Sequence, residues 1–291
     1  MSEQTEVKID AQSVKRLRQE TDAPMMECKK ALVEAEGDFD RAKQILREKG
    51  QAQAAKRAGR ATSEGIAAVV ASEDSTKVAA IVVECETDFV ARNEEFKSMV
   101  SGLVDGLLTT VDADAGETVE ADQSTVVNGT SLKEHAEKAV AKIRENIRIV
   151  SAVVATAADG GKIAIYNHTN TGKAASYVEY TGDDGDAAFQ VAIHTAWGKP
   201  VFLKKEDVPQ DVIKKEIEIE TQRAINDGKP PEMAEKIATG RVNKEYYQTQ
   251  VLNEQPFYTD TKKKVSDYAK AAGIEIVGFR HFAVGAGPSD A

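Results

Sequence analysis

The chain has 291 residues, of which 41% are hydrophobic and 30% are charged, and its formal net charge is -10. This length provides for about two domains, each with a hydrophobic core of its own. An acidic chain lacks the excess of lysine and arginine that displaces counterions from phosphates, so we expect no direct contact with nucleic acid, and any charge steering would favour a basic surface.

The N-terminal residues and the two cysteines bear on the cellular compartment. Residues 1–6 have neither the basic nor the apolar region of a secretory signal peptide, and no apolar run in the chain is long enough to cross a bilayer. Cys28 and Cys85 show no metal-ligand spacing and no disulfide framework, so we expect two buried, reduced thiols. The sequence therefore predicts a cytoplasmic protein without a membrane partner.

Residues 7–50 are predicted to form three short helices, because apolar residues recur at three- and four-residue spacings. These residues are Val14 and Leu17 on the first helix, Met25, Cys28 and Leu32 on the second, and Phe39, Ala42 and Leu46 on the third. Gly37-Asp38 and Gly50 are typical of helix ends and starts, since glycine accepts left-handed geometry and aspartate caps the helix that follows. The alanine-rich and basic stretch 51–60 is expected to be a partly helical connection to the next domain.

Between Thr62 and Lys205 the same pattern occurs twice, a β-hairpin followed by a helix. The first copy has strands at 66–71 and 78–86 and a helix at 96–108, and the second has strands at 162–168 and 174–180 and a helix at 187–197. Each copy predicts an α+β unit with its helix on one face of the sheet. In strand 78–86, Ile81, Val83 and Cys85 alternate with Val82, Glu84 and Glu86, which predicts one buried face and one wetter face.

The turn between the first hairpin and its helix contains Thr87-Asp88-Phe89-Val90. Thr87 and Asp88 suit the start of a helix, because their side-chain oxygens accept hydrogen bonds from its unpaired amides. Neither role requires Phe89, and the corresponding turn of the second copy, Thr181 to Gly185, has no aromatic residue. Two interpretations stay open from the residues alone. Phe89 packs under the helix as a hydrophobic staple, or it is an exposed anchor that contributes about 1.5 to 3 kcal/mol when a partner buries it.

Three further segments complete the predicted fold. A charged helix over 131–146 leads into a strand that begins at 147–150. Residues 209–254 have the pattern of two antiparallel helices separated by Gly228-Lys229-Pro230-Pro231, and Gly240 and Lys244 interrupt the apolar repeat, which favours a short pair over a long coiled coil. A last strand spans 274–282, and the residues from Gly285 onward are expected to fray.

The predicted fold class is therefore α+β, with an N-terminal three-helix module, a two-part core of repeated hairpin-helix units and an inserted antiparallel helical hairpin. The expected boundaries are 1–54 for the helical module, 55–61 for a linker, 62–156 for the first core subdomain, 157–208 with 256–291 for the second, and 209–255 for the hairpin.

No motif for phosphate, dinucleotide or metal chemistry is present. Gly172-Lys173 is followed by Ala174 and lacks the upstream glycine of a phosphate-binding loop. The four histidines His135, His168, His194 and His281 are scattered and form no HExxH motif. We therefore expect neither a cofactor nor a metal ion, although an acid/base site assembled from distant residues stays open as an alternative.

Two separated motifs carry a family resemblance. With the run from Leu17 to Leu32 (LRQETDAPMMECKKAL) set beside Thr87-Asp88-Phe89-Val90, the chain resembles bacterial translation elongation factor Ts over nearly its whole length. Residues 228–244 and Gln255-Pro256-Phe257 resemble the family's helical hairpin and the return of the chain to its core. The resemblance implies a ubiquitin-associated-like helical module, a two-part α+β core and a protruding hairpin.

The resemblance also implies a function and a site. It implies a guanine-nucleotide exchange factor, not an enzyme, that binds elongation factor Tu carrying GDP and promotes GDP release by disturbing the Mg²⁺ and phosphate site. The family's magnesium-dislodging corner corresponds to Thr87, Asp88, Phe89 and Val90. Further partner contacts are implied for Met25, Met26, Ile143 and His168. The helical hairpin is a candidate surface for self-association.

The residues by themselves leave other interpretations open. Met25 and Met26 would equally suit the core of a small helical bundle, and His168 would suit a solvated turn. For the whole chain, one alternative is a non-exchanging adaptor built on the helical module, which would have no use for the Thr87–Val90 corner. Another is an enzyme with a dispersed acid/base site, which would require an inward-facing, strongly perturbed carboxylate or histidine.

Overall fold

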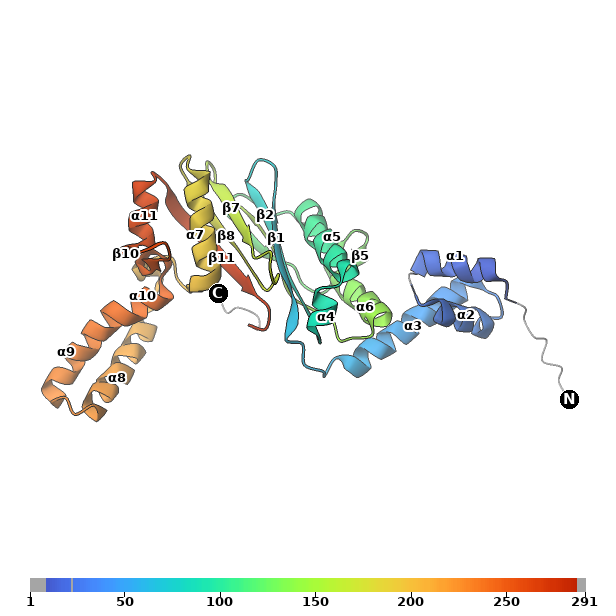
Figure 1. Cartoon of the computed structure of the whole chain (residues 1–291), viewed down its shortest axis with the longest axis horizontal. Helices are drawn as coiled ribbons and strands as arrows, with labels where there is room; N and C mark the ends of the chain where they lie inside the picture. Colours follow the sequence, from blue (N-terminus) through green and yellow to red (C-terminus); the bar gives the residue numbers. More distant parts are fainter. Residues whose placement is uncertain (1–8, 22, 287–291) are drawn as a thin grey trace.

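The computed structural model describes residues 9–21 and 23–286 (Figure 1). Residues 1–8, Asp22 and residues 287–291 lie outside the described residues, and with them the N-terminal segment examined for a signal peptide and most of the tail predicted to fray. The protein is a mixed α+β structure with N-terminal helices, several small antiparallel sheets and a protruding pair of helices. Within the described ranges no helix has the length and apolar character needed to cross a bilayer.

The N-terminal helices are α1 (Ala11–Thr21), α2 (Met25–Glu34) and α3 (Phe39–Arg57). Their shared core contains Leu17, Cys28 and Leu32, as the spacing predicted. The prediction that a helix ends at Gly50 was wrong, because α3 continues to Arg57. Gly50 is buried instead where α3 crosses α6 (Leu132–Ile143), and a Cβ placed there would lie 3.5 Å from Cβ of Ala141. A small residue at this crossing lets the two helices approach closely.

The first sheet is antiparallel and has the strand order β1-β2-β6-β3. Its strands are β1 (Glu64–Ala71), β2 (Lys77–Cys85), β3 (Thr118–Glu120) and β6 (Arg148–Thr156). One face is covered by α5 (Glu94–Thr110) and α6, whose apolar side chains bury Ile81 and Val83 of β2. A short hairpin of β4 (Val126–Val127) and β5 (Thr130–Ser131) precedes α6.

The second sheet has the order β11-β8-β7 and is also antiparallel. Its strands are β7 (Lys162–Asn167), β8 (Ala174–Thr181) and β11 (Glu275–Ala283). The helices α7 (Gly185–Gly198) and α11 (Val265–Ala271) pack on one face. The α11 helix and the short pair β9 (Pro256–Phe257) and β10 (Asp260–Lys264) were not predicted.

The remaining faces of the two sheets pack against each other. Val82 of β2 and Tyr177 of β8 belong to one buried cluster between the sheets. The prediction of a wetter face on β2 was therefore wrong, since Val82 and Glu84 are both buried. The carboxylate of Glu84 accepts hydrogen bonds from Thr62 Oγ1 at 2.7 Å and from the Gly285 amide at 3.0 Å. The order of layers is helices, sheet, sheet, helices.

The segment after α7 forms a pair of helices that projects away from the sheets (Figure 1). It consists of α8 (Gln210–Asn226), α9 (Pro231–Arg241), a π-helical turn η2 (Val242–Tyr246) and α10 (Tyr247–Gln250), with 3-10 turns η1 (Lys205–Asp207) before and η3 (Leu252–Glu254) after it. The π-helical turn contains Lys244, where the apolar repeat was predicted to be interrupted. Arg241 ties the two helices together through Glu220 and Asp227, each at 3.2 Å.

Candidate partner-binding corner

The corner joins the end of β2 to a four-residue helix, α4 (Asp88–Ala91). Thr87 is its N-cap, and Thr87 Oγ1 accepts a hydrogen bond from the Val90 amide at 3.4 Å. The long helix α5 starts separately, with Asn93 accepting from the Glu95 amide at 2.8 Å. The prediction that Thr87 caps a helix is confirmed, but the helix is an additional short turn of its own and not the start of α5.

Phe89 lies on the outer side of α4 and is 83% exposed. The two residues that follow it turn inward, since Ala91 is buried and Val90 packs partly against the core between the first sheet and α5. The staple interpretation is therefore wrong, because the ring does not pack under the helix. Ordinary burial of apolar side chains does not explain a large aromatic at this position, and exposed aromatics are common anchors in protein interfaces.

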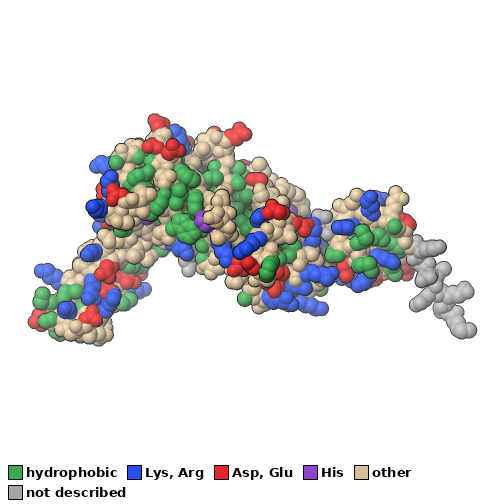
Figure 2. Space-filling model, in the orientation of Figure 1, with side chains coloured by type: hydrophobic (Ala, Val, Ile, Leu, Met, Phe, Trp, Pro, Cys, Tyr) green, Lys and Arg blue, Asp and Glu red, His purple; other side chains and the backbone are tan. Residues whose placement is uncertain are grey.

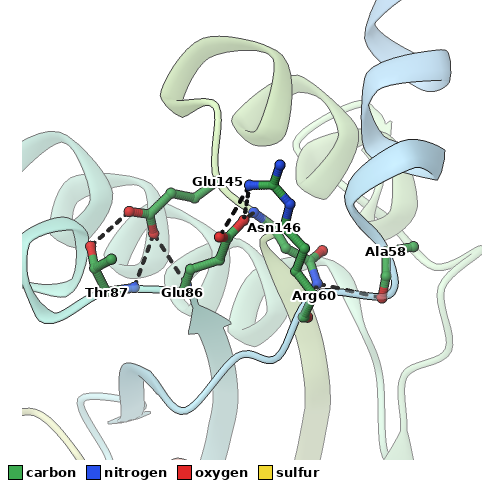
Figure 3. A network of polar contacts seen from close by, with 6 residues as sticks. All are labelled: Ala58, Arg60, Glu86, Thr87, Glu145 and Asn146. Atoms are coloured by element: carbon green, nitrogen blue, oxygen red, sulfur yellow. Dashed lines mark hydrogen bonds and ion pairs between the residues drawn. The ribbon is translucent and has the colours of Figure 1, made fainter.

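Glu145, which follows α6, holds the backbone of the corner (Figure 3). Its Oε2 accepts hydrogen bonds from the amides of Glu86 and Thr87, both at 3.1 Å, and its Oε1 accepts from Thr87 Oγ1 at 2.7 Å. These contacts span 58 and 59 residues of sequence. No local spacing pattern signals such a contact, so Glu145 was not predicted from the sequence.

A second set of contacts anchors the same region to the segment that follows α3. Glu86 accepts from the Asn146 amide at 2.6 Å and forms an ion pair with Arg60 at 3.3 Å. The side-chain amide of Asn146, which is buried, donates to the carbonyls of Arg60 at 2.7 Å and Ala58 at 3.5 Å. Figure 3 shows that the segment after α3, the end of β2 and the turn after α6 meet in this one network.

In the corner, the Cys85 thiol stays protonated and the Asp88 carboxylate is paired with a nearby cation. Burial and the nearby Glu145 carboxylate raise the pKa of Cys85 to about 12, so the thiol stays a donor and contacts the Thr87 carbonyl at 3.2 Å. Asp88 forms an ion pair with Arg92 at 3.3 Å, one turn further along the chain. Among the described residues, no group of three or more histidine, cysteine and carboxylate side chains is arranged to hold a metal ion.

Met25 and Met26 are both exposed, at 51% and 62%, at the start of α2. The alternative that they form the core of the N-terminal helices is therefore wrong, since Cys28, Ala31 and Leu32 supply that core from α2. Figure 1 shows α2 well separated from α4, so the structure does not bring these methionines together with Phe89.

Ile143 ends α6 two residues before Glu145, which places it next to the corner's polar support. Its side chain is half-buried and packs against the core between the first sheet and the helices. It therefore offers only part of its surface to a partner.

His168 directly follows β7 and is half-buried in an aromatic cluster. Its Nδ1 lies 2.8 Å from Tyr166 Oη, and its ring meets Trp197 edge-on at 4.9 Å between centroids. Trp197 and Phe189, both on α7, are exposed and were not singled out from the sequence. The alternative of a solvated turn histidine is therefore wrong. An exposed aromatic on a helix whose other face is alanine-rich was the signal that could have revealed this cluster.

Comparison with known proteins decides the family, because the model of the family described as "Elongation factor TS" matches residues 86–286, which include the corner. The chain belongs to the elongation factor Ts family. It is 41% identical over 280 residues to the elongation factor Ts of Hydrogenobaculum sp. (strain Y04AAS1), covering 95% of this chain and 99% of that one. Identity to the elongation factor Ts of Thioalkalivibrio sulfidiphilus is 38% over 279 residues, covering 96% and 93%. Identity to that of Acinetobacter baumannii is 39% over 279 residues, covering 96% and 92%.

Elongation factor Ts proteins are nucleotide exchange factors for elongation factor Tu in translation elongation, and this is the function of the chain. The family acts in the cytoplasm and is not enzymatic, so the adaptor and enzyme alternatives are set aside by the match. The resemblance inferred from the run Leu17 to Leu32 and the Thr87–Val90 corner is confirmed.

Proposed function

We propose that the Thr87–Val90 corner drives exchange by inserting Phe89 between helices of elongation factor Tu, while Asp88 makes polar contacts that orient it. The inserted ring displaces the phosphate-binding loop and the magnesium ligands of the partner, so that both lose their alignment on GDP. The observation that carries the proposal is the exposure of Phe89 on a turn held by hydrogen bonds on its inner side. No covalent step is needed.

Thermodynamic linkage sets what the corner has to accomplish. A GTPase that holds GDP with nanomolar affinity has about 12 kcal/mol of binding free energy, which comes from backbone amides, a lysine and Mg²⁺ around the phosphates. A factor that binds the nucleotide-free partner more tightly than the GDP-bound partner weakens GDP binding by the same ratio. Burial of one phenyl ring contributes about 1.5 to 3 kcal/mol, which corresponds to roughly 10- to 150-fold. Phe89 therefore supplies one part of the coupling, and further contacts must supply the rest.

We assign these further contacts to Met25 and Met26 on α2 and to Ile143 and His168 in the two core subdomains. The exposure of the two methionines supports the first pair, because flexible thioether side chains adapt to a partner's surface. The exposed Trp197 beside His168 supports the contact at His168, since the histidine then lies at the edge of an aromatic surface. Contacts on separate elements would hold the partner while Phe89 distorts its nucleotide site.

The same proposal divides the chain into working parts. Residues 1–54 form a ubiquitin-associated-like docking module, 55–61 a linker, 62–156 and 157–208 with 256–291 the two core subdomains, and 209–255 an inserted hairpin. A separate hydrophobic cluster within α1–α3 supports an independent module. Because α3 extends to Arg57, the linker begins as helix.

We also propose the helical hairpin as a contact surface for a second copy of the chain. Exposed Ile219 and Ile225 on α8 and Met233 on α9 support this. Figure 2 shows hydrophobic side chains among charged ones on these projecting helices. In sedimentation velocity over a range of protein concentrations, Ile219→Lys should abolish any concentration-dependent increase in the sedimentation coefficient. A monomer at every concentration for the unchanged protein would overturn self-association.

The experiment that tests the exchange proposal is release of a fluorescent GDP analogue from elongation factor Tu. We expect Phe89→Ala to slow the catalysed release by roughly 10- to 150-fold, the range that loss of one buried ring allows. Val126→Ala, which truncates another exposed apolar side chain, is the control and should release the analogue at the unchanged rate. A Phe89→Ala rate equal to that of the control would overturn the proposed role of the corner.

A further inference from the structure

We propose that Glu145 is a positioning residue for nucleotide exchange, because its carboxylate holds the Thr87–Val90 corner in the orientation that presents Phe89 to the partner. The inference rests on the proposed role of Phe89. It assigns to Glu145 no contact with the partner and an effect that is exerted only through the corner.

The corner needs external support because α4 has only four residues. A helix this short cannot sustain itself, since nucleation is costly and isolated helices shorter than about 12 residues are marginal in water. Its single side-chain cap, Thr87, makes a long hydrogen bond of 3.4 Å to the Val90 amide. If this turn opened, the exposed ring of Phe89 would no longer be held in one orientation.

Glu145 supplies that support through three hydrogen bonds. A carboxylate only accepts hydrogen bonds, and here it accepts from the Glu86 and Thr87 amides at 3.1 Å and from Thr87 Oγ1 at 2.7 Å. Hydrogen bonds to a charged acceptor are about twice as strong as neutral ones. The carboxylate thereby satisfies two backbone amides that lie between the end of β2 and the start of α4.

The third contact also sets the cap. The Thr87 hydroxyl has one hydrogen to donate, and donating it to Glu145 leaves the oxygen's lone pairs for the Val90 amide. The Cys85 thiol donates to the Thr87 carbonyl at 3.2 Å. Glu145 therefore holds the backbone of Thr87 in position and sets the orientation in which the Thr87 side chain caps α4.

The position of Glu145 is itself held by its neighbours in sequence. Arg144 is the C-cap of α6 in the left-handed conformation, with φ of 69°, which turns the chain toward the corner. The Asn146 amide donates to Glu86 at 2.6 Å, and its side chain bonds the carbonyl of Arg60 at 2.7 Å. The turn that carries Glu145 is thus joined to the segment that follows α3.

The test replaces Glu145 with glutamine, which keeps the size of the side chain but puts an amide donor where one carboxylate oxygen accepts. We expect Glu145→Gln to lower the saturating rate of GDP-analogue release about tenfold, a change equivalent to about 1.4 kcal/mol. The control is Glu137→Gln, which removes one negative charge from α6 and leaves the Glu145 hydrogen bonds to the corner in place. It should keep the unchanged rate.

A double-mutant cycle separates positioning from general stability. If Glu145 acts through Phe89, adding Glu145→Gln to Phe89→Ala should slow release no further. If the rate reductions of the two single variants multiply in the double variant, the inference is overturned. A wild-type rate for Glu145→Gln when Phe89→Ala is slow would overturn it as well. A wild-type rate for Phe89→Ala would overturn the proposed function itself, and the inference with it.

A second variant keeps the test decisive if Glu145→Gln lowers the folded fraction. Thr87→Val keeps the shape of the side chain and removes the hydroxyl that contacts Glu145. It should slow release in the wild-type background and not in the Phe89→Ala background, and Thr87→Ser should retain more of the rate than Thr87→Val. Equal rates for the valine and serine variants would contradict the role of the hydroxyl contact.

Discussion

Asn167 of β7 pairs with the backbone of Val69 on β1 through both ends of its side-chain amide. Asn167 Oδ1 accepts from the Val69 amide at 2.9 Å, and Nδ2 donates to the Val69 carbonyl at 2.8 Å. The side chain thereby takes the place of a neighbouring strand's peptide and joins the edges of the two sheets. The turn that carries His168 is held beside β1 as well, since the Ala67 amide donates to the Gly172 carbonyl at 2.7 Å.

Replacing Asn167 with leucine should destabilise the protein by about 1 to 3 kcal/mol, because it leaves the amide and carbonyl of Val69 without their partners. Urea unfolding followed by circular dichroism measures the change. Asn170→Leu, in the exposed turn of the same hairpin, is the control and should stay within about 0.5 kcal/mol of the unchanged protein. Equal stability of the two variants would contradict the role of the Asn167 pairing.

Phe89 and Phe96 form a matched pair for separating function from stability. Phe96 is fully buried at the start of α5, so Phe96→Ala should cost about 3 to 5 kcal/mol of unfolding free energy. Phe89→Ala should change stability by less than about 0.5 kcal/mol, because an exposed ring contributes little. Urea unfolding of both variants tests this. A large destabilisation by Phe89→Ala would mean that its ring packs in the protein's own core.

Two histidines, the buried His194 and the half-buried His281, make stability depend on pH. Burial lowers the pKa of His194, against a smaller opposing effect of the hydrogen bond to Gln255, and burial also lowers the pKa of His281. Below the ordinary histidine pKa of about 6.5 the unfolded chain binds protons that the folded chain does not, so stability falls as pH falls through this range.

The free energy of unfolding should accordingly decrease from pH 7.5 to pH 5.5, by at most about 1.4 kcal/mol per pH unit for each histidine. Unfolding in urea at several pH values measures the slope. His194→Gln should make the slope shallower, and a variant with the same slope as the unchanged protein would show that His194 titrates alike in both states.

The sequence allowed prediction of the regular elements wherever one periodic face is buried. The hairpins and helices around Ile81 and around Val178 were found because the apolar side chains that pack between sheet and helix recur at a spacing that is local in sequence. The second buried face of β2 could not be predicted, since the strands that cover Val82 come from a sheet formed much later in the chain. The glycine at position 50 misled the prediction of the helix boundary, since Gly50 lies within α3 where that helix packs against Ala141 of α6.

Part of the candidate site could likewise be predicted from the sequence, and part could not. The motif and the family resemblance identified Thr87 to Val90, but local pattern could not decide whether Phe89 faces the core or the solvent. That orientation depends on Val90 and Ala91 turning inward on a helix of only four residues. Glu145 was missed because its contact with Thr87 spans 58 residues and a lone glutamate after a helix has no distinguishing spacing.

For exchange, the proposed role of Phe89 requires that it bind elongation factor Tu more favourably when GDP has left. Calorimetric titration of the unchanged protein and of Phe89→Ala into GDP-bound and into nucleotide-free elongation factor Tu measures this directly. We predict that Phe89→Ala loses at least about tenfold more affinity for the nucleotide-free form, because only a difference between the two states weakens GDP binding. An equal loss of affinity for both forms would show that Phe89 does not couple partner binding to GDP release.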